Sequence, residues 1–185
     1  APVVPTGLQA HAVTIPVPGG TVAGWRAAGE PGTGARLLLH GVRSSRLQMV
    51  GRAQFLHAAG YTALLIDLPS HGESTGTRIT FGATESSAIR ATLKYLQQSA
   101  PGEKVAVVGV SLGAAFLVLG GAVPVPAAVV VESMHPSRLA SVSSTSGSSP
   151  QRGTWPNTSA IAMRPTPSTR RERPTCHNRC TVDGG

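Results

Sequence analysis

The sequence predicts an α/β domain with a mostly parallel sheet and an antiparallel hairpin at its N-terminus. Between Gln9 and Pro136, short apolar runs alternate with longer segments of helical period, as in βαβ units. The later runs are continuously apolar, which is typical of parallel strands that helices cover on both faces. The first two runs instead alternate between apolar and other residues, and a turn sequence separates them.

The N-terminal hairpin is predicted over residues 11–27. Residues 11–17 and 21–27 place an apolar side chain at every second position, as strands with one face in the core do. Between them, Pro18-Gly19-Gly20 combines residues that favour tight turns. Two alternating runs joined by so short a turn predict antiparallel pairing.

The remaining elements follow from the apolar pattern. Continuous apolar runs predict four strands, at residues 35–40, 62–68, 105–110 and 127–132. Helices are predicted where parallel pairing requires a crossover, at residues 46–59, 83–98 and 111–122. The first two helices are amphipathic, and the third is nearly all apolar, which fits a helix buried against the centre of a sheet.

The composition is that of one folded domain followed by a different segment. Of the 185 residues, 41% are hydrophobic and 13% are charged, and no apolar run approaches the roughly 20 residues of a membrane-spanning helix. From Ser141 onward, Ser, Thr, Pro and Arg make up 26 of 45 residues, which leaves too little apolar surface to offset the entropy cost of ordering. We therefore expect a partial core at residues 1–140 and a disordered or non-native basic tail at residues 141–185.

The net charge of +8 at first suggests a polyanion partner such as nucleic acid. The tail holds half of this charge, and its arginine cluster at residues 170–173 has no interleaved aromatic residues, so we expect no nucleic-acid partner. Cys176-His177-x-x-Cys180 offers at most three ligands where structural zinc takes four, so no metal site is expected. The chain opens with Ala1 rather than Met, from which we expect that its start was trimmed or processed. Its first residues show no signal-peptide pattern, which favours a cytoplasmic location.

The most specific local signal is Gly109-Val110-Ser111-Leu112-Gly113, between a predicted strand and a predicted helix. A G-x-S-x-G sequence in this context is typical of a nucleophile elbow, where a sharp turn exposes the serine and small neighbours let adjacent chain pass close. Ser111 would then lie at the carboxyl edge of the sheet and at a helix N-terminus, whose dipole favours developing negative charge. The alternative is a glycine-rich turn around a buried serine.

An acyl-transfer site also needs two backbone N–H groups that bind the oxyanion. One follows the nucleophile and the other lies in the loop after the third strand, which makes Leu112 and Val42 the candidates. Both would contribute backbone rather than side chains. His40, in the same loop, is expected to shape the loop rather than act as a base.

Four motifs carry a resemblance to a known family: LLLHG at residues 37–41, IDLPSHGES at 66–74, GVSLG at 109–113 and VVVES at 129–133. In order and spacing they resemble the N-terminal core of the α/β-hydrolases, in the broad group of serine aminopeptidase-like, lysophospholipase-like and acyl-thioesterase-like hydrolases. The resemblance covers about residues 9–138. It implies hydrolysis of an ester, thioester or amide of a small molecule through an acyl-enzyme on Ser111, without a cofactor. It also implies that Asp67 shapes the turn after the fourth strand.

A serine hydrolase also needs a base and an acid that orients the base. In this family the acid follows the sixth or seventh strand and the histidine follows the eighth. Glu132 is the one acid in an acceptable place, either as the catalytic acid or as a structural carboxylate paired with an arginine or with backbone amides. His135 is the candidate base, although neither it nor His177, the other downstream histidine, matches the family's position. The rival prediction is therefore a catalytically silent fragment that lacks the general base.

The resemblance stops within a few residues of Ser137. We expect a truncation or frameshift near residues 138–145 and a fold that is incomplete at its C-terminus. The sixth strand would then form the open edge of a parallel sheet, which favours aggregation.

Overall fold

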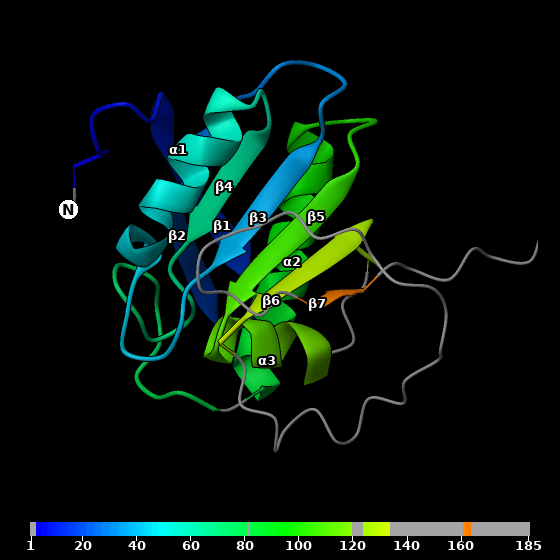
Figure 1. Ribbon diagram of the computed structural model, residues 1–185. Helices are drawn as coiled ribbons and strands as arrows, with labels where there is room; N and C mark the ends of the chain where they lie inside the picture. Colours follow the sequence, from blue (N-terminus) through cyan, green and yellow to red (C-terminus); the bar gives the residue numbers. More distant parts are fainter. Residues whose placement is uncertain (1–2, 81, 120–123, 134–160, 164–185) are drawn as a thin grey trace, which may run out of the picture.

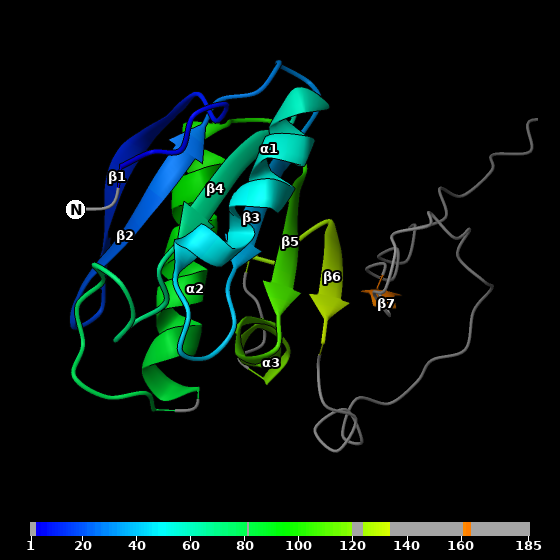
Figure 2. The ribbon, with the colours of Figure 1, turned by 60° about the vertical axis from the view of Figure 1, so that its left-hand side comes forward.

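The computed structural model describes residues 3–80, 82–119, 124–133 and 161–163. These residues form one sheet with helices on both of its faces (Figures 1 and 2). The strand order is β1-β2-β4-β3-β5-β6-β7. Within the described ranges, no helix has the length and apolar character needed to cross a bilayer.

The predicted N-terminal hairpin is confirmed. β1 (Ala10–Val17) pairs antiparallel with β2 (Gly20–Ala27), in a register that sets Ala10 opposite Ala27. β2 also pairs antiparallel with β4 (Thr62–Ile66), which joins the hairpin to the parallel part of the sheet.

The four continuous apolar runs form the parallel part of the sheet, as predicted. β3 (Ala35–Leu39) pairs with β4 on one side and with β5 (Val105–Val110) on the other, and β5 pairs with β6 (Ala128–Glu132). Because parallel strands point the same way, the loops after β3, β5 and β6 meet at one edge of the sheet. That edge carries Ser111, Glu132 and the loop that holds Val42.

The predicted helices are present. They are a 3-10 helix η1 (Arg46–Met49) that continues into α1 (Val50–Ala58), then α2 (Ala83–Ser99) and α3 (Leu112–Leu119). The Glu85 carboxylate caps α2, because it accepts the N–H of Gly82 at 2.9 Å and the N–H and hydroxyl of Thr80 at 2.7 and 2.6 Å. Burial disfavours the charged form of Glu85, but these hydrogen bonds outweigh it and hold its pKa below the usual value.

Alternation along the strands divides the core between the two faces of the sheet. Leu37 and Leu39 of β3 point to the face covered by α2 and α3 and pack in one cluster with Phe116. Leu38 points to the opposite face, in a second cluster with Met49 of η1 and the α1 side chains. Because the strand is buried on both faces, every position of the LLL run is apolar.

A short strand, β7 (Ile161–Met163), pairs antiparallel with β6 and sets Met163 opposite Val129. The sequence predicts no strand after residue 140 and an open edge at β6, so β7 corrects both expectations. A strand of three residues can form by pairing with the free N–H and C=O groups of a sheet edge. A segment this short shows no apolar period that would predict it from the sequence. Most of the tail lies outside the described residues, and its disorder stays a prediction.

Candidate active site

Ser111 occupies the turn between β5 and α3. Its φ of 49° lies in the left-handed region, which residues other than glycine rarely adopt. Its N–H donates to the carbonyl of Glu132 at 2.8 Å, and its carbonyl accepts the N–H of Ala115 at 3.0 Å. The serine is thus held in a strained conformation between the end of β6 and the first turn of α3, in the strand–turn–helix context that its motif predicts.

The glycines on either side of Ser111 allow close packing. A Cβ on Gly109 would lie 2.8 Å from the Cα of Ala114, and one on Gly113 would lie 2.6 Å from the carbonyl oxygen of His40. Both distances are shorter than real contacts. The approach of α3 to β5 and to the loop after β3 therefore depends on the absence of side chains at these two positions.

The loop after β3 passes beside Ser111. A Cβ on Gly41 would lie 3.6 Å from the Cβ of Ser111, and the Gly41 N–H donates to the side-chain oxygen of Gln48 at 2.8 Å. Among the residues that the structure describes, the N–H groups of Val42 and Leu112 have no acceptor, as a pair of oxyanion donors requires. Sequence reasoning missed Gln48, because a side chain that binds a loop amide leaves no periodic signal.

His40 is buried, and both of its ring nitrogens have partners. Nδ1 donates to the carbonyl of Gly41 at 2.7 Å, and Nε2 accepts the N–H of Leu68 at 2.9 Å. Burial lowers the pKa of His40, and the hydrogen bond to Gly41 opposes this shift only in part. As a neutral ring, His40 joins the loops after β3 and β4, which is the loop-shaping role that the sequence predicts.

Asp67 is buried at the start of the loop after β4. Its carboxylate accepts the backbone N–H groups of Arg46 at 2.7 Å and Glu73 at 2.9 Å, and it pairs with the Arg46 guanidinium at 2.9 Å. The same guanidinium pairs with the Glu73 carboxylate and stacks over Trp25, 4.6 Å from the ring centroid. Asp67 therefore holds the loop against η1, as a turn-shaping residue should. Sequence reasoning missed Arg46, which no motif singles out.

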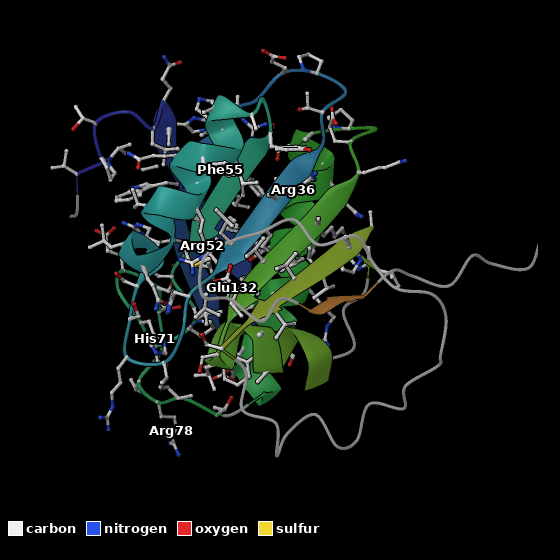
Figure 3. The ribbon with its side chains drawn as sticks, in the orientation of Figure 1. Arg36, Arg52, Phe55, His71, Arg78 and Glu132 are labelled. Carbon is white, nitrogen blue, oxygen red and sulfur yellow. The ribbon has the colours of Figure 1, made fainter. Side chains whose placement is uncertain are left out.

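Glu132 ends β6, and Figure 3 shows Arg52 of α1 reaching toward it. The Arg52 Nε lies 3.2 and 3.0 Å from the two carboxylate oxygens, and Nη2 bonds to one of them. Only 13% of the Glu132 side chain is exposed, so its charge depends on this partner. The pairing is the one expected of a structural carboxylate, and a role for Glu132 as the catalytic acid stays a prediction.

The predicted base and the cysteine motif are not placed by the structure. His135, His177, Cys176 and Cys180 lie outside the described residues. Within the part of the chain that is described, no three His, Cys, Asp or Glu side chains gather as a metal site would require.

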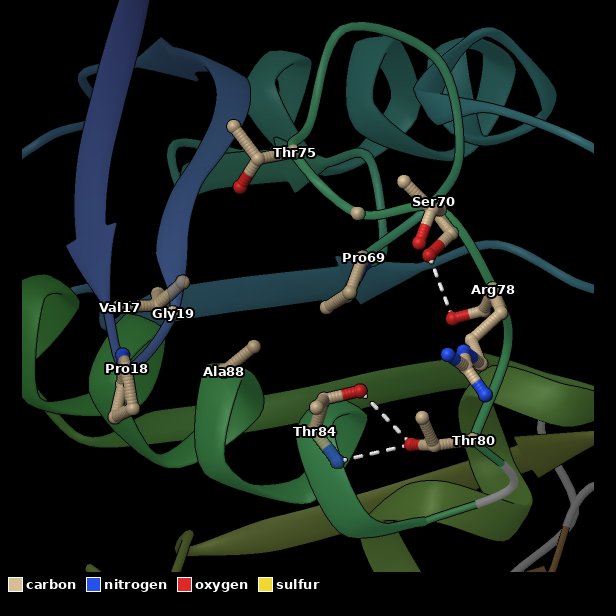
Figure 4. A pocket seen from close by; sticks show the side chains of 12 residues that line it. Val17, Pro18, Gly19, Pro69, Ser70, Thr75, Arg78, Thr80, Thr84 and Ala88 are labelled. Carbon is tan, nitrogen blue, oxygen red and sulfur yellow. Dashed lines mark hydrogen bonds between the residues drawn. The ribbon is translucent and has the colours of Figure 1, made fainter.

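A cavity of about 240 Å³ lies between the β1–β2 turn, the loop after β4 and the start of α2 (Figure 4). Several of its polar side chains bind one another or the backbone: Ser70 donates to the carbonyl of Arg78 at 2.8 Å, and the hydroxyls of Thr80 and Thr84 lie 2.8 Å apart. Ser111 is not among the residues that line it. The cavity is therefore separate from the turn that holds the serine.

A model of the alpha/beta hydrolase family matches residues 37–179, more than half of the chain. Among curated proteins, no match was found. The matched range ends inside the predicted tail, so the boundary near residue 140 stays a prediction.

Solved structures share the fold. An esterase from Pyrococcus furiosus is 28% identical with a TM-score of 0.58, over 65% of this chain and 49% of that protein. An epoxide hydrolase from an endophytic Streptomyces is 26% identical with a TM-score of 0.53, over 69% of this chain and 37% of that protein. A serine hydrolase without a lid from Xanthomonas campestris is 21% identical with a TM-score of 0.58, over 71% of this chain and 63% of that protein. At this identity, the likeness shows the fold alone.

The chain thus spans about half the length of the esterase that it matches. The matched range includes most of β3 and all of β4, β5 and β6, which carry the predicted motifs. The chain belongs to the alpha/beta hydrolase family.

Proposed function

We propose that this chain is a serine hydrolase that cleaves an ester, thioester or amide through an acyl-enzyme on Ser111. The backbone of Ser111 carries the proposal: its φ of 49° holds a serine at the turn between β5 and α3. Strain of this kind persists where surrounding packing enforces it, and it gathers at active sites. Membership of the family and the esterase at 28% identity support the same class of reaction.

In the proposed reaction, the Ser111 hydroxyl oxygen attacks the carbonyl carbon of the substrate. The serine proton passes to a base, and the base then protonates the leaving alcohol, thiol or amine as its bond to the acyl carbon breaks. Water attacks the acyl-enzyme in the same way, which releases the carboxylic acid and restores the serine. His135 is the candidate base, and Glu132 is the candidate acid.

The negative oxygen that forms in each attack would be bound by the N–H groups of Val42 and Leu112. Leu112 begins α3, whose dipole also favours negative charge at this end. The Gly41 N–H is not available for this role, because Gln48 accepts it. Each such donor contributes on the order of 3 kcal/mol to stabilisation of the transition state.

The competing proposal is a catalytically silent member of the family. The pairing of Glu132 with Arg52 favours it, because a carboxylate with both oxygens engaged by an arginine is not free to orient a histidine. On this view the turn at Ser111 is retained without a working base.

Labelling with a fluorophosphonate probe separates the two proposals. Wild type, Ser111→Ala and the control Ser133→Ala are labelled in parallel, after circular dichroism has shown that each is folded. Ser133 is a matched control because it also has a positive φ, 52°, and follows β6 at the same edge of the sheet. Labelling lost only in Ser111→Ala supports the hydrolase. Folded wild-type protein that takes no label supports the silent chain.

A further inference from the structure

Two hydrogen-bonded paths run from the continuous segment η1–α1 to Gly41 and Ser111, the residues that precede the two amides assigned to the oxyanion hole. We infer that Gln48 and Arg52 are positioning residues that fix the separation between the N–H groups of Val42 and Leu112. The inference rests on the proposed function, because it concerns the site around Ser111. Each residue acts through a neighbouring backbone group.

Gln48 acts on the loop after β3. Its side-chain oxygen accepts the N–H of Gly41 at 2.8 Å, and the Gly41 carbonyl accepts Nδ1 of His40 at 2.7 Å. The peptide plane that holds this carbonyl also holds the N–H of Val42. With both polar groups of Gly41 engaged, the direction of the Val42 N–H is set, although Val42 itself is exposed.

Arg52 acts on the turn at Ser111. Its guanidinium binds both carboxylate oxygens of Glu132, and the backbone carbonyl of Glu132 accepts the Ser111 N–H at 2.8 Å. In Figure 3, Arg52 reaches from α1 to the end of β6. Arg52 therefore anchors Glu132, whose carbonyl holds Ser111. The N–H of Leu112 belongs to the next residue, so its direction depends on how Ser111 is held.

Both paths begin on the same side of one helical segment. Gln48 and Arg52 stand four residues apart, which places them on one face of η1–α1, and Arg52 Nη1 contacts the carbonyl of Gln48 at 3.5 Å. Met49 and Ala53 of this segment are buried in the core against the sheet. One rigid element thus sets where both loops lie. An oxyanion hole needs such fixed geometry, because its donors act at about 2.7–3.1 Å from the oxygen.

The first test compares Gln48→Ala with Gln54→Ala in the hydrolysis of p-nitrophenyl acetate. Gln54 lies on α1, which continues η1, but its amide donates to the carbonyl of Thr6 at 3.0 Å. We expect Gln48→Ala to lower kcat about tenfold and to change KM less than about twofold, because a displaced donor weakens transition-state binding more than substrate binding. Gln54→Ala should match wild type in both constants.

The second test compares Arg52→Lys with Arg36→Lys. Lysine retains the positive charge but loses the two-pronged contact with Glu132, so kcat should again fall about tenfold at nearly constant KM. Arg36 is the matched control, because it lies near the start of β3 and stacks on Tyr61 at 4.0 Å. Arg36→Lys should leave kcat unchanged.

The outcomes separate this inference from the proposed function. If Gln48→Ala and Arg52→Lys are as active as their controls while Ser111→Ala is inactive, the serine hydrolase stands and the inference is overturned. If wild type has no serine-dependent activity, the proposed function fails, and hydrogen–deuterium exchange measured by NMR decides the inference. Faster exchange of the Gly41 amide in Gln48→Ala and of the Ser111 amide in Arg52→Lys supports it, and unchanged exchange overturns it.

Discussion

The carbonyl oxygen of His40 lies so close to Gly113 that a Cβ on this glycine would be 2.6 Å away. The same Cβ would lie 2.8 Å from the Cβ of Leu39, a buried residue of β3. Neither neighbour is the flexible end of a side chain, so the contact cannot be relieved without moving backbone. The position of α3 relative to β3 depends on this one missing side chain.

We expect Gly113→Ala to lower the free energy of unfolding by about 2–3 kcal/mol, because the added methyl overpacks a buried contact. Gly51→Ala is the control, since it lies in α1 with nothing within 4 Å of the added Cβ and no positive φ. Replacing a helical glycine by alanine there should raise stability by about 0.5–1 kcal/mol. Urea unfolding measures both, and equal effects of the two substitutions would contradict the packing argument.

The strain at Ser111 predicts an unusual order of stability. Ser111→Gly should be more stable than Ser111→Ala by about 1 kcal/mol, because alanine keeps the Cβ that disfavours a φ of 49°. At Ser87, inside α2, the alanine variant should instead be more stable than the glycine variant by about 1 kcal/mol. Urea unfolding of the four variants checks this, and an alanine that is equal to or better than glycine at position 111 would rule out backbone strain.

Loss of the buried charge on Asp67 should destabilise the chain strongly. Asp67→Asn leaves the Arg46 guanidinium, 2% exposed, without its buried ionic partner, and should cost about 3 kcal/mol of unfolding free energy. Glu103→Gln removes a surface carboxylate that accepts the Gly32 N–H, and should change stability by no more than about 0.5 kcal/mol. Thermal or urea unfolding gives both values, and an Asp67→Asn as mild as its control would show that the pair contributes little.

The cap on α2 should make stability depend on pH. Because the pKa of Glu85 in the folded chain is below its ordinary value of 4.5, the unfolded state binds a proton first as the pH falls. The stabilisation is therefore full above pH 4.5 and is lost as the pH falls toward the folded-state pKa. We expect Glu85→Gln to cost about 2 kcal/mol at neutral pH, from hydrogen bonds to a charged acceptor, and less as the pH falls below 4.5. Urea unfolding across this range tests it, and a cost independent of pH would contradict it.

The elements of the fold could be predicted because their signals are local. β3, β4 and β5 are buried on both faces, so their sequences are continuously apolar, whereas β1 keeps one face exposed and alternates. The turn at Ser111 could be predicted for a similar reason, because the close packing around it requires glycine two residues away on each side. β7 was missed, since its pairing depends on the edge of β6 rather than on its own residues.

The α/β class, the hairpin and the turn at the serine could be predicted because each depends on a pattern of residues a few positions apart. The groups that surround the serine come from distant parts of the chain, so long-range packing brings them together. Arg52 and Glu132 are 80 residues apart, and Gln48 reaches Gly41 from a separate element, so their pairing follows from how α1 packs on the sheet. Whether Glu132 serves as an acid or as a partner for arginine depends on that packing, because the charge of a carboxylate buried at a strand end is stabilised only by the group that reaches it.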